Sequence, residues 1–213
     1  MAGEPGPGVW PEKGARDRLF RWVAAKPDWA LGFEDECWWS RVTDPAMHTW
    51  SEADRPLRLC EKRVAPGEPK ALACYGLWLP LEEQMLLRFV AGRPLSGATT
   101  EFLDWVSREV HRAGKQALFL VWDNASWHDS AAVRTWLREH NRQVKAGAKT
   151  GVRLVICPLP KKAPWLNPIE PKWLHGKRAV AEPGATLDEI ELMARVHEHF
   201  DCAAHALLST GVS

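Results

Sequence analysis

The hydrophobic period of this chain changes near residue 98, and that change limits the possible folds more than any other feature. Before it, three apolar stretches bounded by turn residues have the pattern of buried strands: 29–42, 70–80 and 83–94. Residues 98–116 instead carry apolar side chains at the spacing of one helix face: Phe102, Leu103, Val106 and Val110. The pattern therefore predicts strands first and a helix after them.

Beyond residue 116 the two periods alternate. The pattern predicts a strand, a helix, a strand and two helices: 117–127, 129–145, 152–160, a helix opening at Asn167, and 186–208. A hairpin is also predicted over 47–63. Three consecutive antiparallel strands followed by alternating helices and strands predict an α/β fold, a mixed sheet with helices on both faces. This is the element order of the ribonuclease-H-like fold.

The 213 residues, 46% of them apolar, fit one large domain or one domain with tails. Glycine, proline and charged residues are frequent at the start of the sequence, so residues 1–28 are expected to form a flexible lead-in or linker. Residues 29–213 are expected to form one domain that ends in a helix.

Charge is distributed unevenly along the sequence, although the net charge is only +1. Residues 111–180 hold 13 Lys and Arg against 4 Asp and Glu. This excess suggests a face for a polyanion, but solvated helix faces give the same count. The residues alone leave both interpretations open.

The five cysteines are scattered and form no CxxC pair, which argues against a zinc ribbon and a disulfide framework. No apolar run approaches the length of a membrane span, and the first residues contain no signal-peptide core. A cytoplasmic protein that does not associate with membranes is therefore expected.

Three carboxylates stand at predicted element boundaries: Asp35 at the acidic end of the first strand, Asp123 after "FLVW", and Glu170 in the first turn of a helix. Converging carboxylates suit Mg²⁺ or Mn²⁺. Each also has a structural alternative. Asp123 can close a turn, Glu170 can complement a helix dipole, and Glu34 or Glu36 can replace Asp35 as the ligand. From spacing alone these alternatives stay open.

Two blocks, "FLVWDNASWH" and "ICPLPKKAPWLNPIEPKW", resemble the DDE transposases of the mariner superfamily, in particular their bacterial insertion-sequence branch. The second block matches that family at six positions: Leu166, Asn167, Pro168, Ile169, Glu170 and Trp173. Upstream, "FEDECWWSRV" is similar to the family's first block, with Asp35-Glu36 as the matching pair, and Trp50 resembles the tryptophan of the hairpin that follows. The resemblance covers residues 29–180.

The resemblance implies that residues 29–213 form a ribonuclease-H-like DDE catalytic domain. Asp35, Asp123 and Glu170 would be its catalytic triad and would hold two Mg²⁺ or Mn²⁺ ions. The implied reaction is cleavage at the ends of an insertion sequence, then attack of the freed 3′-hydroxyl on target DNA. The implied setting is a bacterial cytoplasm, associated with the nucleoid, and the implied partners are double-stranded DNA at transposon ends and target, and a second copy of the chain.

The chain departs from the family in two respects. Residues 1–28 are too short for the helix-turn-helix domains that precede the family's catalytic domain, so that part is expected to be missing or supplied by a separate chain. In addition, 46 residues separate Asp123 from Glu170, more than is usual in the family. A non-catalytic or decayed remnant that only binds DNA or partner chains is the alternative, and a different nuclease of the same fold is a third hypothesis.

Other residues of the matching blocks are candidates for weaker roles. Asn124, His128 and Asn167 are expected to support the triad, although structural caps and a surface histidine explain the same positions. Four residues near the proline-rich turn are candidate DNA contacts: Lys161, Lys162, Trp165 and Lys172. A solvated loop explains the lysines equally well, and Trp165 also fits a packing role.

Overall fold

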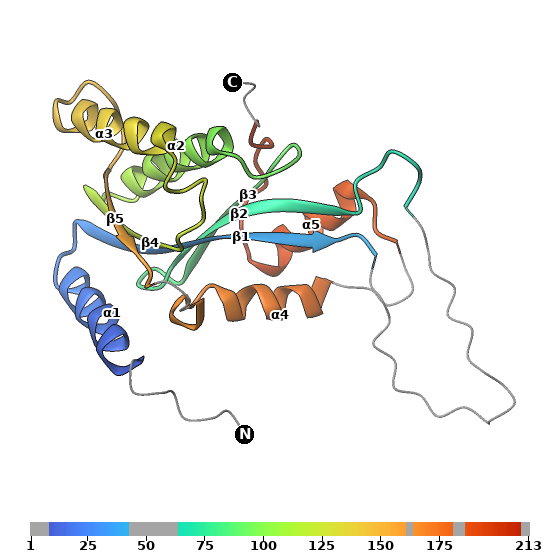
Figure 1. Ribbon diagram of the computed structural model, residues 1–213, viewed down its shortest axis with the longest axis horizontal. Helices are drawn as coiled ribbons and strands as arrows, with labels where there is room; N and C mark the ends of the chain where they lie inside the picture. The colour runs from blue at the N-terminus through green and yellow to red at the C-terminus, as the bar shows by residue number, and fades with distance from the viewer. Residues whose placement is uncertain (1–8, 43–63, 161–163, 181–185, 210–213) are drawn as a thin grey trace, which may run out of the picture.

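The computed structural model describes residues 9–42, 64–160, 164–180 and 186–209. Its centre is a five-stranded sheet with the strand order β3-β2-β1-β4-β5 (Figure 1). β1 pairs antiparallel with β2, and β2 with β3, whereas β1, β4 and β5 are mutually parallel. The strands are β1 (Trp29–Ser40), β2 (Ala71–Leu79), β3 (Gln84–Phe89), β4 (Ala117–Trp122) and β5 (Arg153–Pro158). The predicted mixed sheet is confirmed.

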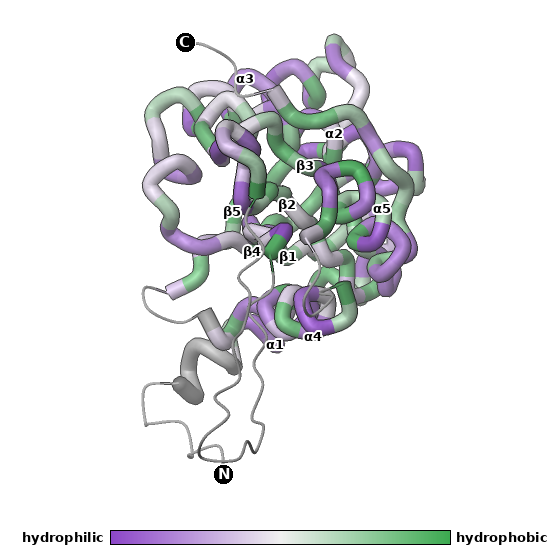
Figure 2. The backbone as a smooth tube through the Cα atoms, turned by 90° about the vertical axis from the view of Figure 1, so that its right-hand side faces the viewer, coloured by the Kyte–Doolittle hydropathy of each residue, from purple (hydrophilic) through white to green (hydrophobic). Residues whose placement is uncertain are grey.

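Helices cover both faces of this sheet, as expected. α2 (Ser96–Arg112) and α3 (Ala131–Lys145) lie on one face, and α1 (Val9–Ala24), α4 (Glu170–Val180) and α5 (Glu189–His199) lie on the other (Figure 1). Seen from the side, the hydrophobic strands lie between these helical layers (Figure 2). None of the described helices is long and apolar enough to cross a membrane.

β1 sends successive side chains to opposite faces of the sheet, and both faces are covered. Leu31 and Phe33 belong to the apolar cluster under α1, α4 and α5, whereas Ala30 belongs to the cluster under α2 and α3. The same alternation sends Asp35 toward the α4 face and sends Glu34 and Glu36 toward the α2 face. The direction of each acid is therefore fixed by the apolar residues before it.

The expectation of a flexible lead-in over residues 1–28 is wrong for residues 9–24, which form α1. Val23 is fully buried, and Trp22 packs edge-on against Trp29 and Phe119, with ring centroids 4.7 Å and 5.2 Å away. Tertiary contacts of this kind stabilise a helix whose composition alone does not favour one. Residues 1–8 lie outside the described residues.

Three other boundaries differ from their predictions or are untested. The first strand does not end at its acids, because pairing with β2 continues to Ser40. The last helix ends at His199 instead of continuing to residue 208, because Asp201 takes a left-handed φ of 48°. The predicted hairpin over 47–63, with Trp50, lies outside the described residues.

Candidate active site

The strand register brings Asp35 and Asp123 level with each other. In the parallel pair of β1 and β4 the last matched residues are Phe33 and Val121. Two residues further along each chain stand Asp35, which alternation directs toward the face that carries α4, and Asp123, the first residue after β4. The two carboxylates therefore stand at the point where these neighbouring strands stop pairing.

Glu170 is held near β1 by the turn that precedes it. The side-chain amide of the buried Asn167 donates to the carbonyl oxygen of Glu34 (3.2 Å), and its oxygen accepts from the backbone N–H of Ile169 (3.4 Å). Glu170 is the first residue of α4, so its helix begins three residues after this anchor. Asn167 thus links the start of α4 to the backbone of the residue before Asp35.

Trp173, one turn further along α4, reaches Asp35 directly. Its indole Nε1 donates to Oδ2 of Asp35 (3.1 Å). The ring fits here because Gly76, the residue of β2 directly opposite Asp35, has no side chain. A Cβ atom at that position would lie 2.3 Å from Cη2 of Trp173. Trp173 packs in the core, and neither its contact with Asp35 nor the role of Gly76 had a signal in the sequence.

The carboxyl group of Asp35 is buried and experiences the negative charges of Glu170 and Glu36. The pKa of Asp35 is raised to about 7, mainly because the carboxyl group is buried and then because Glu170 and Glu36 carry like charge nearby. The hydrogen bond from Trp173 opposes this rise. Two carboxylates in this state can bind a cation with a gain in free energy, because the cation removes their repulsion.

Asp123 has a different environment, because it is half-exposed and already receives two hydrogen bonds. Its Oδ1 accepts from the backbone N–H of Ala125 (2.8 Å) and contacts Nδ1 of His128 at 3.1 Å. The hydrogen bond with His128 lowers the pKa of Asp123. His128 therefore contacts Asp123, the residue that it was expected to support. Both contacts use Oδ1.

His128 is buried and stacks on Trp122, with ring centroids 4.5 Å apart. Its Nε2 lies 3.0 Å from Oε1 of Glu36 and 3.3 Å from Oε2 of Glu34. Burial alone would lower the pKa of His128, but the charge of Glu34 and the hydrogen bonds to Asp123 and Glu36 raise it to about 11. The sequence suggested a surface histidine as one alternative; the structure shows a buried one.

The three carboxylates predicted as a triad do not form a compact cage for one ion. Among the described residues, the ligand atoms of Glu34, Glu36 and His128 all lie within 4.8 Å of one another, and those of Asp35, Asp123 and Glu170 do not form such a group. Two divalent ions about 4 Å apart need carboxylates that are spread more widely than one ion does. The all-oxygen donor set and the repulsion at Asp35 fit Mg²⁺ or Mn²⁺.

The other candidate supporting and DNA-contacting residues differ in their contacts and exposure. The side-chain amide of Asn124 donates to the carbonyl oxygen of Leu159 (2.6 Å), so it ties the end of β4 to the end of β5. Trp165 is 58% exposed. The ammonium group of Lys172 lies 3.4 Å from the ring centroid of Trp78, a cation–π contact. Lys161 and Lys162 lie outside the described residues.

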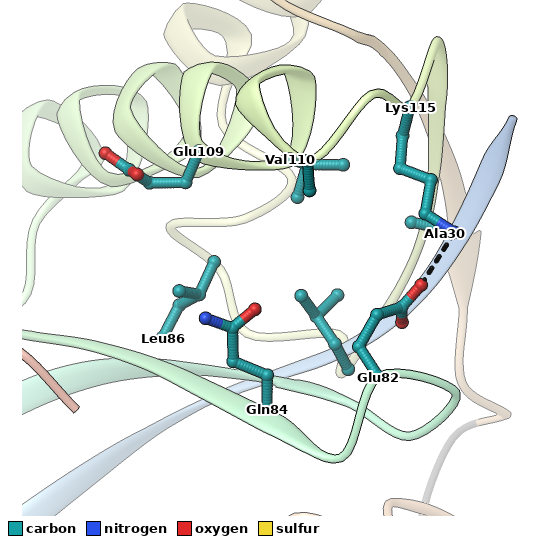
Figure 3. A pocket seen from close by; sticks show the side chains of 9 residues that line it. Ala30, Glu82, Gln84, Leu86, Glu109, Val110 and Lys115 are labelled. Atoms are coloured by element: carbon teal, nitrogen blue, oxygen red, sulfur yellow. Dashed lines mark ion pairs between the residues drawn. The ribbon is translucent and has the colours of Figure 1, made fainter. Parts of the chain in front are cut away.

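Two of the hollows among the described residues lie against the sheet, and neither is lined by Asp35, Asp123 or Glu170. One of about 110 Å³ lies between α2 and the β2–β3 turn, and the ion pair of Glu82 and Lys115 (2.8 Å) stands at its side (Figure 3). The length of β4, about 20 Å at 3.3 Å per residue, separates it from Asp123. The other, about 360 Å³, is apolar and is lined by residues such as Leu19, Val121 and Leu159.

The profile of the DDE superfamily endonucleases matches residues 83–193, which is more than half of the chain. The chain belongs to this family. The matched range contains Asp123 and Glu170 and begins after Asp35. No curated protein matches the sequence.

Solved structures of Mos1 transposase have a similar fold. The paired-end complex with the left transposon end has a TM-score of 0.65 and 15% sequence identity, over 95% of this chain and 57% of that one. The catalytic domain of Mos1 mariner transposase has a TM-score of 0.56 and 13% identity, over 95% of this chain and 86% of that one. The match confirms the ribonuclease-H-like transposase catalytic fold. This chain spans little more than half of the longer Mos1 chain.

Proposed function

We propose that this DDE endonuclease domain is the catalytic domain of a mariner-superfamily transposase of the bacterial insertion-sequence branch. It would cleave DNA at the ends of an insertion sequence and transfer the freed 3′-hydroxyl to target DNA. One observation carries the proposal. The register of β1 and β4 brings Asp35 level with Asp123, while Asn167 anchors the start of α4, and with it Glu170, to the same segment of β1.

Asp35, Asp123 and Glu170 would hold two Mg²⁺ or Mn²⁺ ions. When bound, such ions activate an attacking oxygen and stabilise the leaving oxygen of a phosphodiester. The protein's own residues position the carboxylates for that task. Trp173 fixes Oδ2 of Asp35, and His128 fixes Oδ1 of Asp123, which leaves Oδ2 of Asp123 free to bind a cation.

DNA contacts would come from the proline-rich turn and the start of α4. The exposed ring of Trp165 is suited to stacking on a displaced base, and Lys161 and Lys162 to phosphate contacts. Lys172 would have to leave Trp78 to reach a phosphate. In this proposal the substrate is double-stranded DNA, the chain acts as a homodimer on that DNA, and a separate chain supplies the helix-turn-helix domains. The protein would work at the bacterial nucleoid.

A plasmid-nicking assay with the full chain tests the catalytic role. In Mn²⁺ or Mg²⁺ the chain should convert supercoiled plasmid to the open-circular form, and EDTA should stop the reaction. Asp35→Asn, Asp123→Asn and Glu170→Gln should each abolish nicking, whereas Glu139→Gln, an exposed change on α3, should not. Nicking by Asp123→Asn at the rate of the unmodified protein would contradict the proposal.

Metal binding provides a second readout that does not depend on turnover. The electron paramagnetic resonance signal of free Mn²⁺ should fall when the chain is added, and each triad variant should weaken this binding. The non-catalytic alternative would be favoured by two results together: the chain binds DNA without nicking it, and it binds Mn²⁺ no more tightly than its triad variants do.

A further inference from the structure

Behind the triad, on the opposite face of β1, lies a second group of cation-binding side chains. Glu34 and Glu36 project from β1 toward the α2 face, and His128 comes from the segment between β4 and α3. They are almost fully buried, with 1%, 8% and 2% of the side-chain surface exposed. Asp35 and Glu170 lie on the α4 face instead, and the group contacts the predicted triad only where His128 reaches Asp123.

Glu34 is the unusual member of this group. Both of its carboxylate oxygens are inaccessible to solvent, and neither has a hydrogen-bond partner in the structure. Oε2 lies 3.3 Å from Nε2 of His128, but the pair does not have the geometry of a hydrogen bond. A buried carboxylate without a donor is costly. Burial raises the pKa of Glu34, and the nearby charges of Glu36, Asp35 and Asp123 raise it further against the opposing effect of His128.

The distances around His128 match those of a metal site. Ligands that each lie about 2.1 Å from a zinc ion are about 3.0 to 3.4 Å from one another. Nε2 of His128 is 3.0 Å from Oε1 of Glu36 and 3.3 Å from Oε2 of Glu34. An ion could therefore bind between these atoms without a large rearrangement. The second oxygen of Glu34 is also buried nearby and can complete the coordination.

The other nitrogen of His128 has the partner that metal-bound histidines usually have. Metal-ligating histidines donate the second ring N–H to a carboxylate or carbonyl, which fixes the ring and its tautomer. Nδ1 of His128 contacts Oδ1 of Asp123 at 3.1 Å. If Nδ1 donates that bond, an ion that binds at Nε2 displaces the proton held there, and the lone pair then points to the two glutamates. The stacking of His128 on Trp122 holds the ring in this orientation.

We propose that Glu34, Glu36 and His128 form a structural site for one transition-metal ion of the Zn²⁺ or Co²⁺ type, distinct from the triad. The imidazole ligand favours these ions over Mg²⁺, for which the all-oxygen triad is better suited. The closed surroundings fit a structural site and not a catalytic one. Through the hydrogen bond of His128 the bound ion would also hold Asp123 in place.

Co²⁺ titration of the full chain tests the site. The protein is first treated with EDTA, and millimolar Mg²⁺ is then added in excess to occupy the triad. The visible absorption of Co²⁺ should then report one ion bound per chain in a site with a nitrogen ligand. Glu34→Gln should weaken this binding by about tenfold or more. Even the loss of a residue that only hydrogen-bonds to a metal ligand lowers metal affinity by about that factor. Absence of Co²⁺ binding, or equal binding by Glu34→Gln, would overturn the proposal and leave a protonated His128 as the group's cation.

Thermal unfolding separates metal binding from a purely structural role of Glu34. Without metal, Glu34→Gln should melt at or above the temperature of the unmodified protein, because it removes a buried carboxylate that has no donor. With Zn²⁺ the order should reverse, since Zn²⁺ should raise the melting temperature of the unmodified protein alone. The same order in both conditions would contradict the site.

This proposal can fail independently of the catalytic one. Asp35→Asn and Glu170→Gln change the opposite face and should retain Co²⁺ binding in excess Mg²⁺. If these variants lose nicking but bind Co²⁺, both proposals stand. If they lose Co²⁺ binding together with nicking, the ion occupies the triad, and the separate site is disproved.

Discussion

Replacing Asp35 by asparagine should stabilise the metal-free protein, and the gain should grow as the pH rises. Asparagine is nearly the same size as aspartate and can still accept the hydrogen bond from Trp173. It cannot carry the negative charge that burial and the neighbouring Glu170 and Glu36 oppose. The variant therefore separates the charge of Asp35 from its shape.

The magnitude follows from the pKa of Asp35, which rises from an ordinary value of 3.8 to about 7. Between about pH 4 and pH 7 the folded state retains a proton on Asp35 that the unfolded state has lost, so the stability of the unmodified protein falls as the pH rises. At about 1.4 kcal/mol per pH unit the full effect is about 4 kcal/mol. Because the group is only partly buried, we expect about half of that figure above pH 7.

Urea unfolding monitored by tryptophan fluorescence measures this effect, and the 13 tryptophans give a strong signal. In EDTA, the advantage of Asp35→Asn over the unmodified protein should be small near pH 4 and about 2 kcal/mol near pH 8. Glu198→Gln, which changes an exposed carboxylate of α5, serves as the control and should show no such trend. Adding Mg²⁺ should recover stability in the unmodified protein and not in Asp35→Asn.

Parallel pH profiles for Asp35→Asn and the unmodified protein would refute the reasoning. That result would mean that Asp35 ionises as freely in the folded chain as in the unfolded one, so its carboxyl group would be neither buried nor opposed by the charge of Glu170. The pairing of these two residues as metal ligands would then lose its electrostatic support, even if the strand register were correct.

Three further substitutions test the positions of the supporting residues. Gly76→Ala should lower the free energy of unfolding by about 1 to 3 kcal/mol and change the near-ultraviolet circular dichroism, because the new methyl group meets the ring of Trp173; an unchanged spectrum would contradict that contact. Asn167→Ala should cost about 1 to 3 kcal/mol in urea unfolding by leaving the carbonyl of Glu34 without its donor, and a cost near zero would disprove the anchor. Trp22→Ala should cost about 1 kcal/mol and accelerate proteolytic cleavage within residues 9–24, whereas equal cleavage rates would support a flexible lead-in.

Among the described residues between 29 and 180, the sequence was sufficient to predict the order of the strands and helices, because each element there has a clear hydrophobic period. It was not sufficient to predict α1. The proline, glycine and charge of its first residues argue against a helix, and its stability comes from the contacts of Trp22 and Val23 with side chains that lie far away in the sequence. Local composition carries no information about such partners.

The acids of β1 show the same limit within the candidate site. Alternation in the sequence already separated Asp35 from Glu34 and Glu36, and the apolar residues before them determine which face each acid meets. The sequence could not show which side chains of other elements lie on each face. Asp35 meets Trp173 and Glu170, whereas Glu34 and Glu36 meet a histidine that lies about 90 positions later. A strand whose neighbouring acids face different partners can therefore serve two cation sites, and substitutions at Glu34 and Asp35 should separate them although the residues are adjacent in the chain.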